Sequence, residues 1–215
     1  MFFWFFGVPN ATDQASATLL MCSFSCFAVL GVLLFQLAVQ TSQERSSPWM
    51  RYLQTVPVRE LNLTLARVGA SFVLSVLAIA LVVATTFATT NFDGKDFPWF
   101  QFFAALLLGG IPFALMALVM GYLIKGKAIL PFANMIYLPL SFAGGLWLPP
   151  NALPKAIQDI SENLPTRHFG EVVWAVAFKK DIPKEATNGL IIYALIYVLT
   201  FLIILKKKSW TEKTS

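Results

Sequence analysis

Few side chains in this sequence could carry out covalent, acid–base or redox chemistry. The chain has one histidine, His168, and two cysteines, Cys22 and Cys26, which lie four residues apart in an apolar run. On a helix the two thiols share a face but are poorly placed to bridge each other. No HExxH, GxSxG or paired-glutamate arrangement is present, and neither is a GxxxxGK[ST] nucleotide loop. We therefore predict no catalytic, metal or cofactor site, so any nucleotide-driven work requires another chain.

The composition indicates a polytopic membrane protein. Of the 215 residues 57% are apolar and only 13% are charged, whereas about 25% is usual in soluble domains. All 27 acidic and basic residues fall in predicted loops or at helix ends. An ionisable group within a span is the usual mark of a proton relay, so its absence argues against a proton-driven transporter, although backbone carbonyls could still bind Na⁺.

Five apolar runs are long enough to be predicted as complete spans. They cover residues 17–39, 68–90, 98–124, 128–148 and 189–205. The opening MFFWFFG is too short to cross a bilayer, which takes about 20 residues; it is either an interfacial anchor or the end of a first helix that this chain lacks. The fourth run contains Pro131, Pro139 and Gly144-Gly145, which predict a kinked or broken helix.

The basic residues predict the orientation of these spans. Ten of the 16 lysines and arginines fall in residues 41–67, in the Lys125/Lys127 turn and in the tail, which alternation of the spans places on one side. Since Lys and Arg set topology, loop 41–67 and the C-terminus should be cytoplasmic, and segment 149–188 should lie outside. The net charge of +5 is then explained by topology, and we predict contact with membrane lipids but not with nucleic acid.

The polar stretch from Glu44 to Arg67 contains an amphipathic pattern. Trp49, Tyr52, Leu53 and Val56 have the i, i+3, i+4, i+7 spacing of one helix face. Two interpretations are open. The helix could lie in the lipid headgroups, or its apolar face could dock into a groove of a soluble partner.

Two motifs give the chain a specific resemblance. Residues Glu44 to Pro57 read loosely E-R-x(3)-[apolar]-x-R-x-L-x-T-x-P, and a second motif runs from Asn134 to Pro149, followed by two Leu-Pro pairs. Their order and sidedness extend over residues 17–208. In these features the chain resembles the membrane-spanning permease subunit of type-2 ATP-binding cassette exporters.

This resemblance implies an all-α fold in a single transmembrane domain, residues 1–215, with a coupling helix and a short outer re-entrant helical region. Family members have six spans, so either the first is missing here or the variant is shorter. The resemblance also implies a separate ATPase that binds ATP and Mg²⁺, with no cofactor on this chain. A second permease copy, identical or different, would complete a transporter in the plasma (inner) membrane.

The resemblance also assigns roles to particular residues. The predicted ATPase-coupling interface comprises Glu44, Arg45, Trp49, Arg51, Tyr52, Leu53, Val56 and Pro57. A possible path or kink comprises Asn134, Pro139, Gly144, Gly145 and Trp147. Polar residues within spans, such as Gln36, are expected mainly to form hydrogen bonds between helices. Asn134 is the best candidate for more, because it could bond to backbone groups freed by a proline.

We therefore expect an exporter permease for an amphipathic substrate such as a drug, antibiotic or lipid, without a catalytic site of its own. The alternative is a non-transporting membrane protein, such as an immunity or sensor-anchoring factor, whose loop binds another partner. A membrane enzyme is disfavoured because no acid, base or metal cluster is present.

Overall fold

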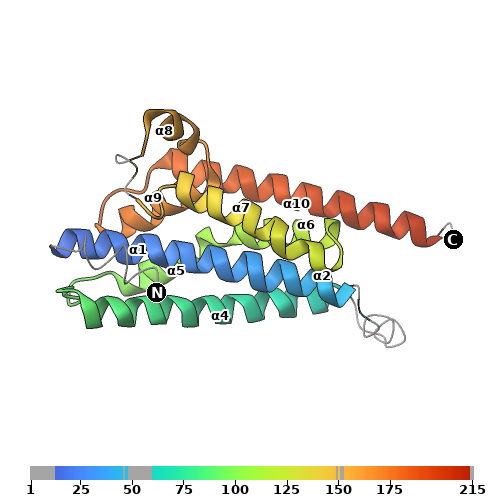
Figure 1. The fold of residues 1–215 in the computed structure, drawn as a ribbon, viewed down its shortest axis with the longest axis horizontal. Coiled ribbons are helices and arrows are strands. Elements are labelled where there is room, and N and C mark those ends of the chain that lie inside the picture. Colours follow the sequence, from blue (N-terminus) through green and yellow to red (C-terminus); the bar gives the residue numbers. More distant parts are fainter. Residues whose placement is uncertain (1–12, 46, 48–59, 149, 151–152, 214–215) are drawn as a thin grey trace.

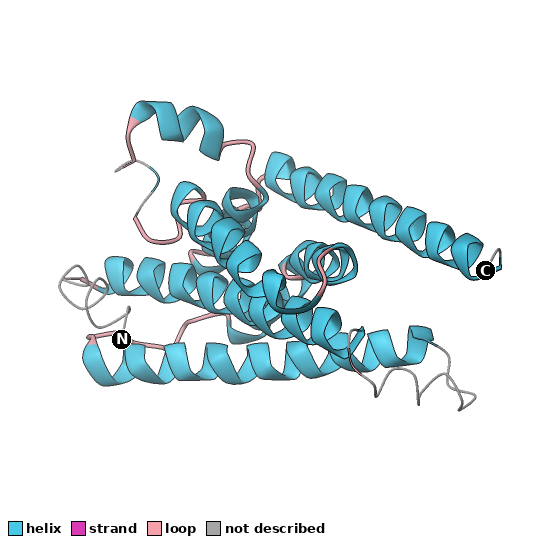
Figure 2. Ribbon diagram, turned by 45° about the vertical axis from the view of Figure 1, so that its right-hand side comes forward, coloured by secondary structure: helices cyan, strands magenta, loops and turns pink. Residues whose placement is uncertain are grey.

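The computed structural model of the chain describes residues 13–45, 47, 60–148, 150 and 153–213, and these contain helices and no strands (Figure 2). Four of the helices are long and apolar enough to cross a membrane. They are Gln14–Arg45, Leu61–Thr89, Trp99–Leu123 and Lys184–Lys206. Each exceeds the about 20 residues that a span requires, and each contains most of one predicted span.

The first long helix has three parts. It consists of α1 (Gln14–Gly31), the π-helical segment η3 (Val32–Ala38) and α2 (Val39–Arg45). Asp13 caps its start, because the carboxylate accepts a hydrogen bond from the Ser16 backbone N–H at 3.3 Å. A second hydrogen bond, from the Ser16 hydroxyl, lowers the pKa of Asp13.

The other elements follow in order. They are α4 (Glu60–Thr89), α5 (Trp99–Gly109), α6 (Ile111–Leu123), the short 3₁₀ turn η4 (Gly126–Ala128), α7 (Ile129–Ala143), α8 (Lys155–Ser161), α9 (Pro165–Ala177) and α10 (Lys184–Lys213). Proline lies in the first turn of α9, where its missing N–H costs no helical hydrogen bond.

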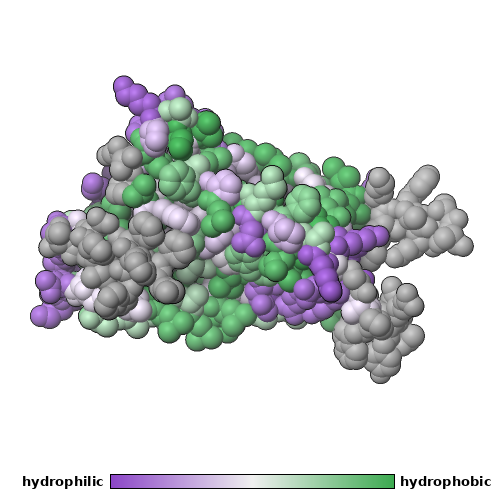
Figure 3. All heavy atoms as spheres, in the orientation of Figure 1, coloured by the Kyte–Doolittle hydropathy of each residue, from purple (hydrophilic) through white to green (hydrophobic). Residues whose placement is uncertain are grey.

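The helices differ in how far they are buried. Helices α4 and α10 run along opposite edges of the bundle with α1 and α2 between them (Figure 1). In the most apolar stretch of each span, 67% of residues are buried in the first helix and in Trp99–Leu123, against 17% in α4 and 6% in α10. Figure 3 shows hydrophobic residues along both edges and hydrophilic residues toward the two ends. This distribution is typical of edge helices that face lipid.

We name the two ends of the bundle by their connections. The loop end is where α2 stops and α4 starts, and residues 46–59, the connecting loop, join them there. The turn end is the opposite one, where α1 starts and where residues 90–98 join α4 to α5.

The fourth predicted span is shorter than expected. Helix α7 has 15 residues and continues through Pro139. It ends at Gly144-Gly145, where Gly145 has φ of +76° and the Leu146 N–H bonds to the Ser141 carbonyl at 3.1 Å. These are features of a Schellman C-cap, which favours glycine. The break therefore lies at the glycines rather than at the proline, and the count of five spans is not confirmed for the described residues.

The predicted outer segment contains two short helices, α8 and α9, before α10 begins. Helix α9 packs into the bundle at the turn end. The Trp174 indole N–H donates to the Ser23 hydroxyl of α1 at 3.0 Å, and the Thr166 hydroxyl donates to the Leu140 carbonyl of α7 at 2.7 Å. Phe169, which lies between Thr166 and Trp174 in the sequence, is fully buried.

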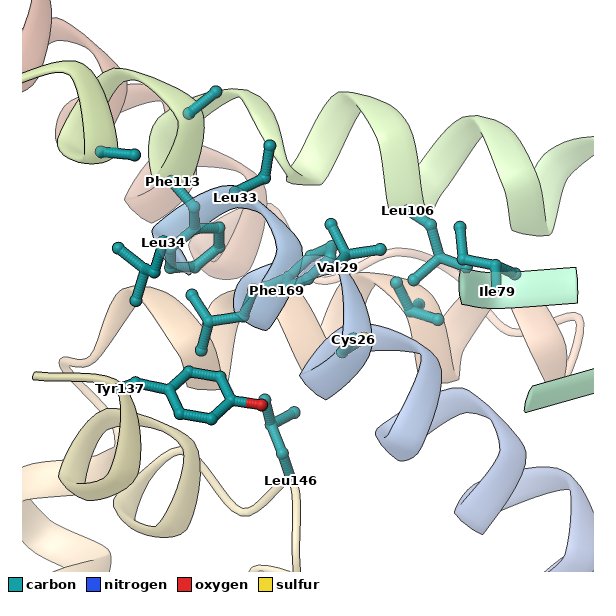
Figure 4. Close-up of a cluster of buried hydrophobic side chains, with 14 of the residues drawn as sticks. Cys26, Val29, Leu33, Leu34, Ile79, Leu106, Phe113, Tyr137, Leu146 and Phe169 are labelled. Atoms are coloured by element: carbon teal, nitrogen blue, oxygen red, sulfur yellow. The ribbon is translucent and has the colours of Figure 1, made fainter. Parts of the chain in front are cut away.

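The core is centred on α1 and η3. Figure 4 shows Val29, Leu33 and Leu34 surrounded by side chains of the neighbouring helices, and all three are inaccessible to solvent. Cys22 and Cys26 lie in the same core as free thiols.

The closest approach of α6 to the first helix depends on Gly121. A methyl group added there would lie 2.7 Å from Cβ of Thr41 and 2.9 Å from the Ala38 carbonyl oxygen. Small residues at helix contacts let backbones approach closely, as is common in membrane bundles.

We predict that Gly121→Ala destabilises the protein by about 1–3 kcal/mol, the usual result of overpacking. The same change at Gly69, where nothing lies within 4 Å of the added methyl, serves as the control. Gly69→Ala should be neutral or slightly stabilising, since alanine is the better helix former. Unfolding in mixed micelles measures both, and equal stability of the two variants would contradict this packing.

Candidate functional site

The loop end contains the start of the predicted coupling motif. Glu44 and Arg45 close α2, directly before the connecting loop. The other six predicted coupling residues lie outside the described residues; they are Trp49, Arg51, Tyr52, Leu53, Val56 and Pro57. The geometry below therefore concerns the base of the loop.

Glu44 pairs with Arg67 across the base of the loop. A guanidinium nitrogen of Arg67 lies 2.5 Å from a carboxylate oxygen of Glu44, and the Arg67 side chain is only 7% exposed. The other Glu44 oxygen accepts a hydrogen bond from the Gln40 amide at 2.7 Å. The ion pair joins the helix before the loop to the helix after it.

Arg45 attaches the same helix end to α6. Its guanidinium donates to the Tyr122 carbonyl at 2.6 Å and lies 4.2 Å from the centre of the Tyr122 ring. The last carbonyls of a helix have no partner within the helix and carry partial negative charge, so a cation is favourable there. Ser42 adds a hydrogen bond to the Ile124 carbonyl at 2.6 Å. Three long helices are thus tied together where the loop leaves the bundle.

These contacts refine the sequence analysis. Glu44 and Arg45 were predicted to form part of an interface with another chain, but in the structure their charged groups bond to their own chain. Neither the pairing of Arg67 with Glu44 nor the contact of Tyr122 with Arg45 was predicted from the sequence. The pattern that could have suggested Arg67 is an arginine one residue before an apolar span, opposite a glutamate that ends the previous one.

Helix α7 has one exposed face. Asn134 and Pro139 lie on this face together with Met135, which is 74% exposed. The Asn134 amide donates to the Leu130 carbonyl at 3.2 Å, whereas the carbonyl that Pro139 leaves without its helical donor is that of Met135. This bond of Asn134 therefore does not compensate for the proline, and its side chain stands on an open surface.

The inner face of α7 meets α1 and η3 through aromatic rings. The Tyr137 hydroxyl donates to the Phe27 carbonyl at 3.2 Å, and Gly31 leaves room for its ring. The Trp147 ring centre lies 5.6 Å from that of Phe27. The structure thus places Trp147 beside α1, while Gly144 packs against Thr166 of α9.

Polar side chains run along the first long helix from η3 to the loop end. Gln36 donates to Gln40 at 3.4 Å, and Gln40 donates to Glu44. Gln36 is exposed although its neighbours Leu34 and Leu37 are completely buried. An exposed amide within a span needs water or a polar partner, because lipid offers neither.

His168, the single histidine, lies in α9 against α10. A methyl group at Gly189 would collide with the imidazole ring, and the buried Nδ1 has no hydrogen-bond partner among the described residues. Within those residues no three histidine, cysteine or acidic side chains converge in a way that could hold a metal ion.

Fold and site together define a multi-pass membrane protein whose long helices are joined by charged contacts at the loop end. The sequence matches the family described as ABC-2 family transporter protein over residues 6–206, and the chain belongs to this family. It is a transport permease, and its family is one of transport subunits rather than enzymes.

One curated relative is the protein named "Putative transport permease YvfS" of Bacillus subtilis (strain 168). The two are 27% identical over 202 residues, which cover 93% of this chain and 82% of that protein. No solved structure matches the chain.

We predict that Arg67→Gln costs about 1–3 kcal/mol of stability, because Glu44 then lacks the partner for its charge. Glu171→Gln, which breaks the Arg167–Glu171 pair on the α9 surface, should cost only about 0.3–0.5 kcal/mol. Unfolding of both variants in mixed micelles makes the comparison. A loss for Arg67→Gln no larger than for Glu171→Gln would show that the pair at the loop base contributes little.

Proposed function

We propose that this permease is the membrane subunit of an ATP-driven exporter, and that a separate ATPase binds at the connecting loop. The observation that supports this most is the attachment of the loop base. Glu44 bonds to Arg67 of α4 and Arg45 bonds to α6. A partner that displaces the loop would therefore move three spanning helices at once.

The charge distribution supports a cytoplasmic loop end. Lys125 and Lys127 lie exposed at this end, and Lys206 extends from α10 toward it. Cytoplasmic loops carry an excess of Lys and Arg. We infer that the C-terminus is cytoplasmic in a plasma (inner) membrane, where the ATPase would have access to ATP and Mg²⁺.

The exposed face of α7 and the polar side chains of the first helix support a path between two permease copies, as homodimer or heterodimer. Both Asn134 and Gln36 are exposed polar residues within apolar helices. Aromatic rings of Phe27 and Trp147 lie toward the turn end. A path with amides and aromatic rings suits an amphipathic substrate such as a drug, antibiotic or lipid, whose apolar part contacts rings while its polar part forms hydrogen bonds.

The ATPase assignment predicts that Trp49→Asp and Leu53→Asp abolish co-purification with the ATPase and ATP-dependent transport, because both place charge on the proposed docking face. The ATPase to test is the product of a neighbouring gene with a Walker A loop. Gln54→Asp adds the same charge elsewhere on the predicted helix and should retain both activities. Unchanged assembly and transport in the Trp49 and Leu53 variants would refute the coupling role of the loop.

The path assignment predicts that Asn134→Cys reacts with a water-soluble maleimide in reconstituted vesicles, at a rate that changes when the ATPase is trapped with vanadate. The native thiols Cys22 and Cys26 are buried and give little background. Ala133→Cys, at the neighbouring buried position, is the control. Mass spectrometry measures the labelled fraction, and equal slow labelling at both positions would remove Asn134 from the path.

A further inference from the structure

A series of contacts leads from Arg45, directly before the connecting loop, through α6 to Phe169 of α9. We propose that the α5–α6 helix transmits movement of the loop base to α9, and that Arg45 at its loop end and Phe169 at its central junction are the positioning residues. The inference rests on the proposed function, since it concerns how the work of the ATPase crosses the membrane.

At the loop end, α2 and α6 are closely packed. Arg45 donates to the Tyr122 carbonyl and covers the Tyr122 ring. Next to Tyr122, Gly121 allows the α6 backbone to lie so close to Thr41, one turn before Arg45, that an added methyl would overlap it. Because closely packed helices have few alternative arrangements, movement of α2 carries the end of α6 with it.

The helix from Trp99 to Leu123 is a single span with one weak point. Gly110 separates α5 from α6, and Pro112 removes one backbone donor next to it. The hydrogen bonds from the Gly110 N–H to Leu106 and from the Ala114 N–H to Gly110, each 3.0 Å, maintain the helix across this point. Without further support the junction could bend and absorb a push.

Phe169 of α9 contacts the helix before and after this junction. Its ring fills the space beside Gly109, where an added methyl would lie 2.5 Å from Cδ2, and its centre is 5.4 Å from that of Phe113. Gly109 belongs to α5 and Phe113 belongs to α6. The rings of Phe113 and Phe169 are both completely buried (Figure 4). The ring therefore stiffens the junction and also receives its displacement.

Helix α9 in turn contacts the end of α7. The Thr166 hydroxyl, one turn before Phe169, bonds to the Leu140 carbonyl, and Thr166 packs on Gly144. Trp147 follows directly beyond this cap. A shift of α9 thus reaches the residues that the sequence analysis placed at the path.

A parallel connection offers a matched control. Trp174 links α9 to Ser23 of α1 without involving α5 or α6. If the linkage runs through α6, loss of both the Arg45 and the Phe169 contacts should impair transport no more than loss of one of them. Loss of the Ser23 contact should add its own impairment.

The test is a double-mutant cycle in vesicles that contain the full permease and its ATPase. Arg45→Gln and Phe169→Leu should each lower transport per ATP hydrolysed by at least about fivefold, the lower end of typical coupling between sites. Basal ATP hydrolysis and assembly should not change in Phe169→Leu. The Arg45→Gln, Phe169→Leu double variant should transport as much per ATP as the more impaired of the two single variants. When Arg45→Gln is combined with Ser23→Ala, the fold losses of the two single variants should multiply.

Multiplied effects for the Arg45 and Phe169 pair would overturn the linkage while leaving the exporter role intact. Absence of ATP-dependent transport in the unmodified protein would instead overturn the proposed function. Hydrogen–deuterium exchange gives a readout that does not depend on transport rates. Vanadate trapping should change exchange in α9 of the unmodified protein, and this change should vanish in Arg45→Gln; a change that persists there contradicts the proposal.

Discussion

Arg67 and Glu44 are held together at the boundary where the first two long helices enter the bundle, and the arrangement of the loop end follows from that pair. A guanidinium that is 93% shielded requires a compensating charge, since the cost of burying it alone is several kcal/mol. Desolvation offsets much of the attraction between the two groups, so removal of one partner costs more than the intact pair contributes. Its value is positional, since only one alignment of α2 against α4 satisfies both groups.

The rest of the bundle is held by close packing between small and large residues. Gly31 accommodates Tyr137, Gly109 accommodates Phe169 and Gly121 accommodates Thr41. Lipid tails are as apolar as leucine, so burial of apolar area does not drive these contacts in a bilayer as it does in water. Shape complementarity and the few hydrogen bonds to free carbonyls must do so instead. A methyl group in any of the three positions disturbs a contact between two helices.

Much of the fold could be predicted from the sequence, because span length and apolar content are set by the bilayer. The four long helices lie where the apolar runs placed them. The sequence predicted a kinked or broken helix from Pro131, Pro139 and Gly144-Gly145 together, and did not show at which of them α7 would end. The Gly145 backbone in fact ends the helix, with a positive φ that proline cannot adopt. The site was harder to predict, because the partners of Glu44 and Arg45 lie 23 and 77 residues away and no local pattern announces them.

The π-helical segment η3 constrains how this chain can vary in length. A π-helix holds about one residue more than an α-helix of the same rise, so removal of a single residue between Val32 and Ala38 would restore an ordinary helix. The residues beyond it would stay nearly in place, so Glu44 and Arg45 could still reach Arg67 and Tyr122. A deletion in the α-helical turns before it, Gln14–Gly31, would instead turn everything beyond it by about 100° and draw it in by about 1.5 Å. Single-residue deletions should therefore be tolerated better within Val32–Ala38 than in the α-helical turns on either side of it.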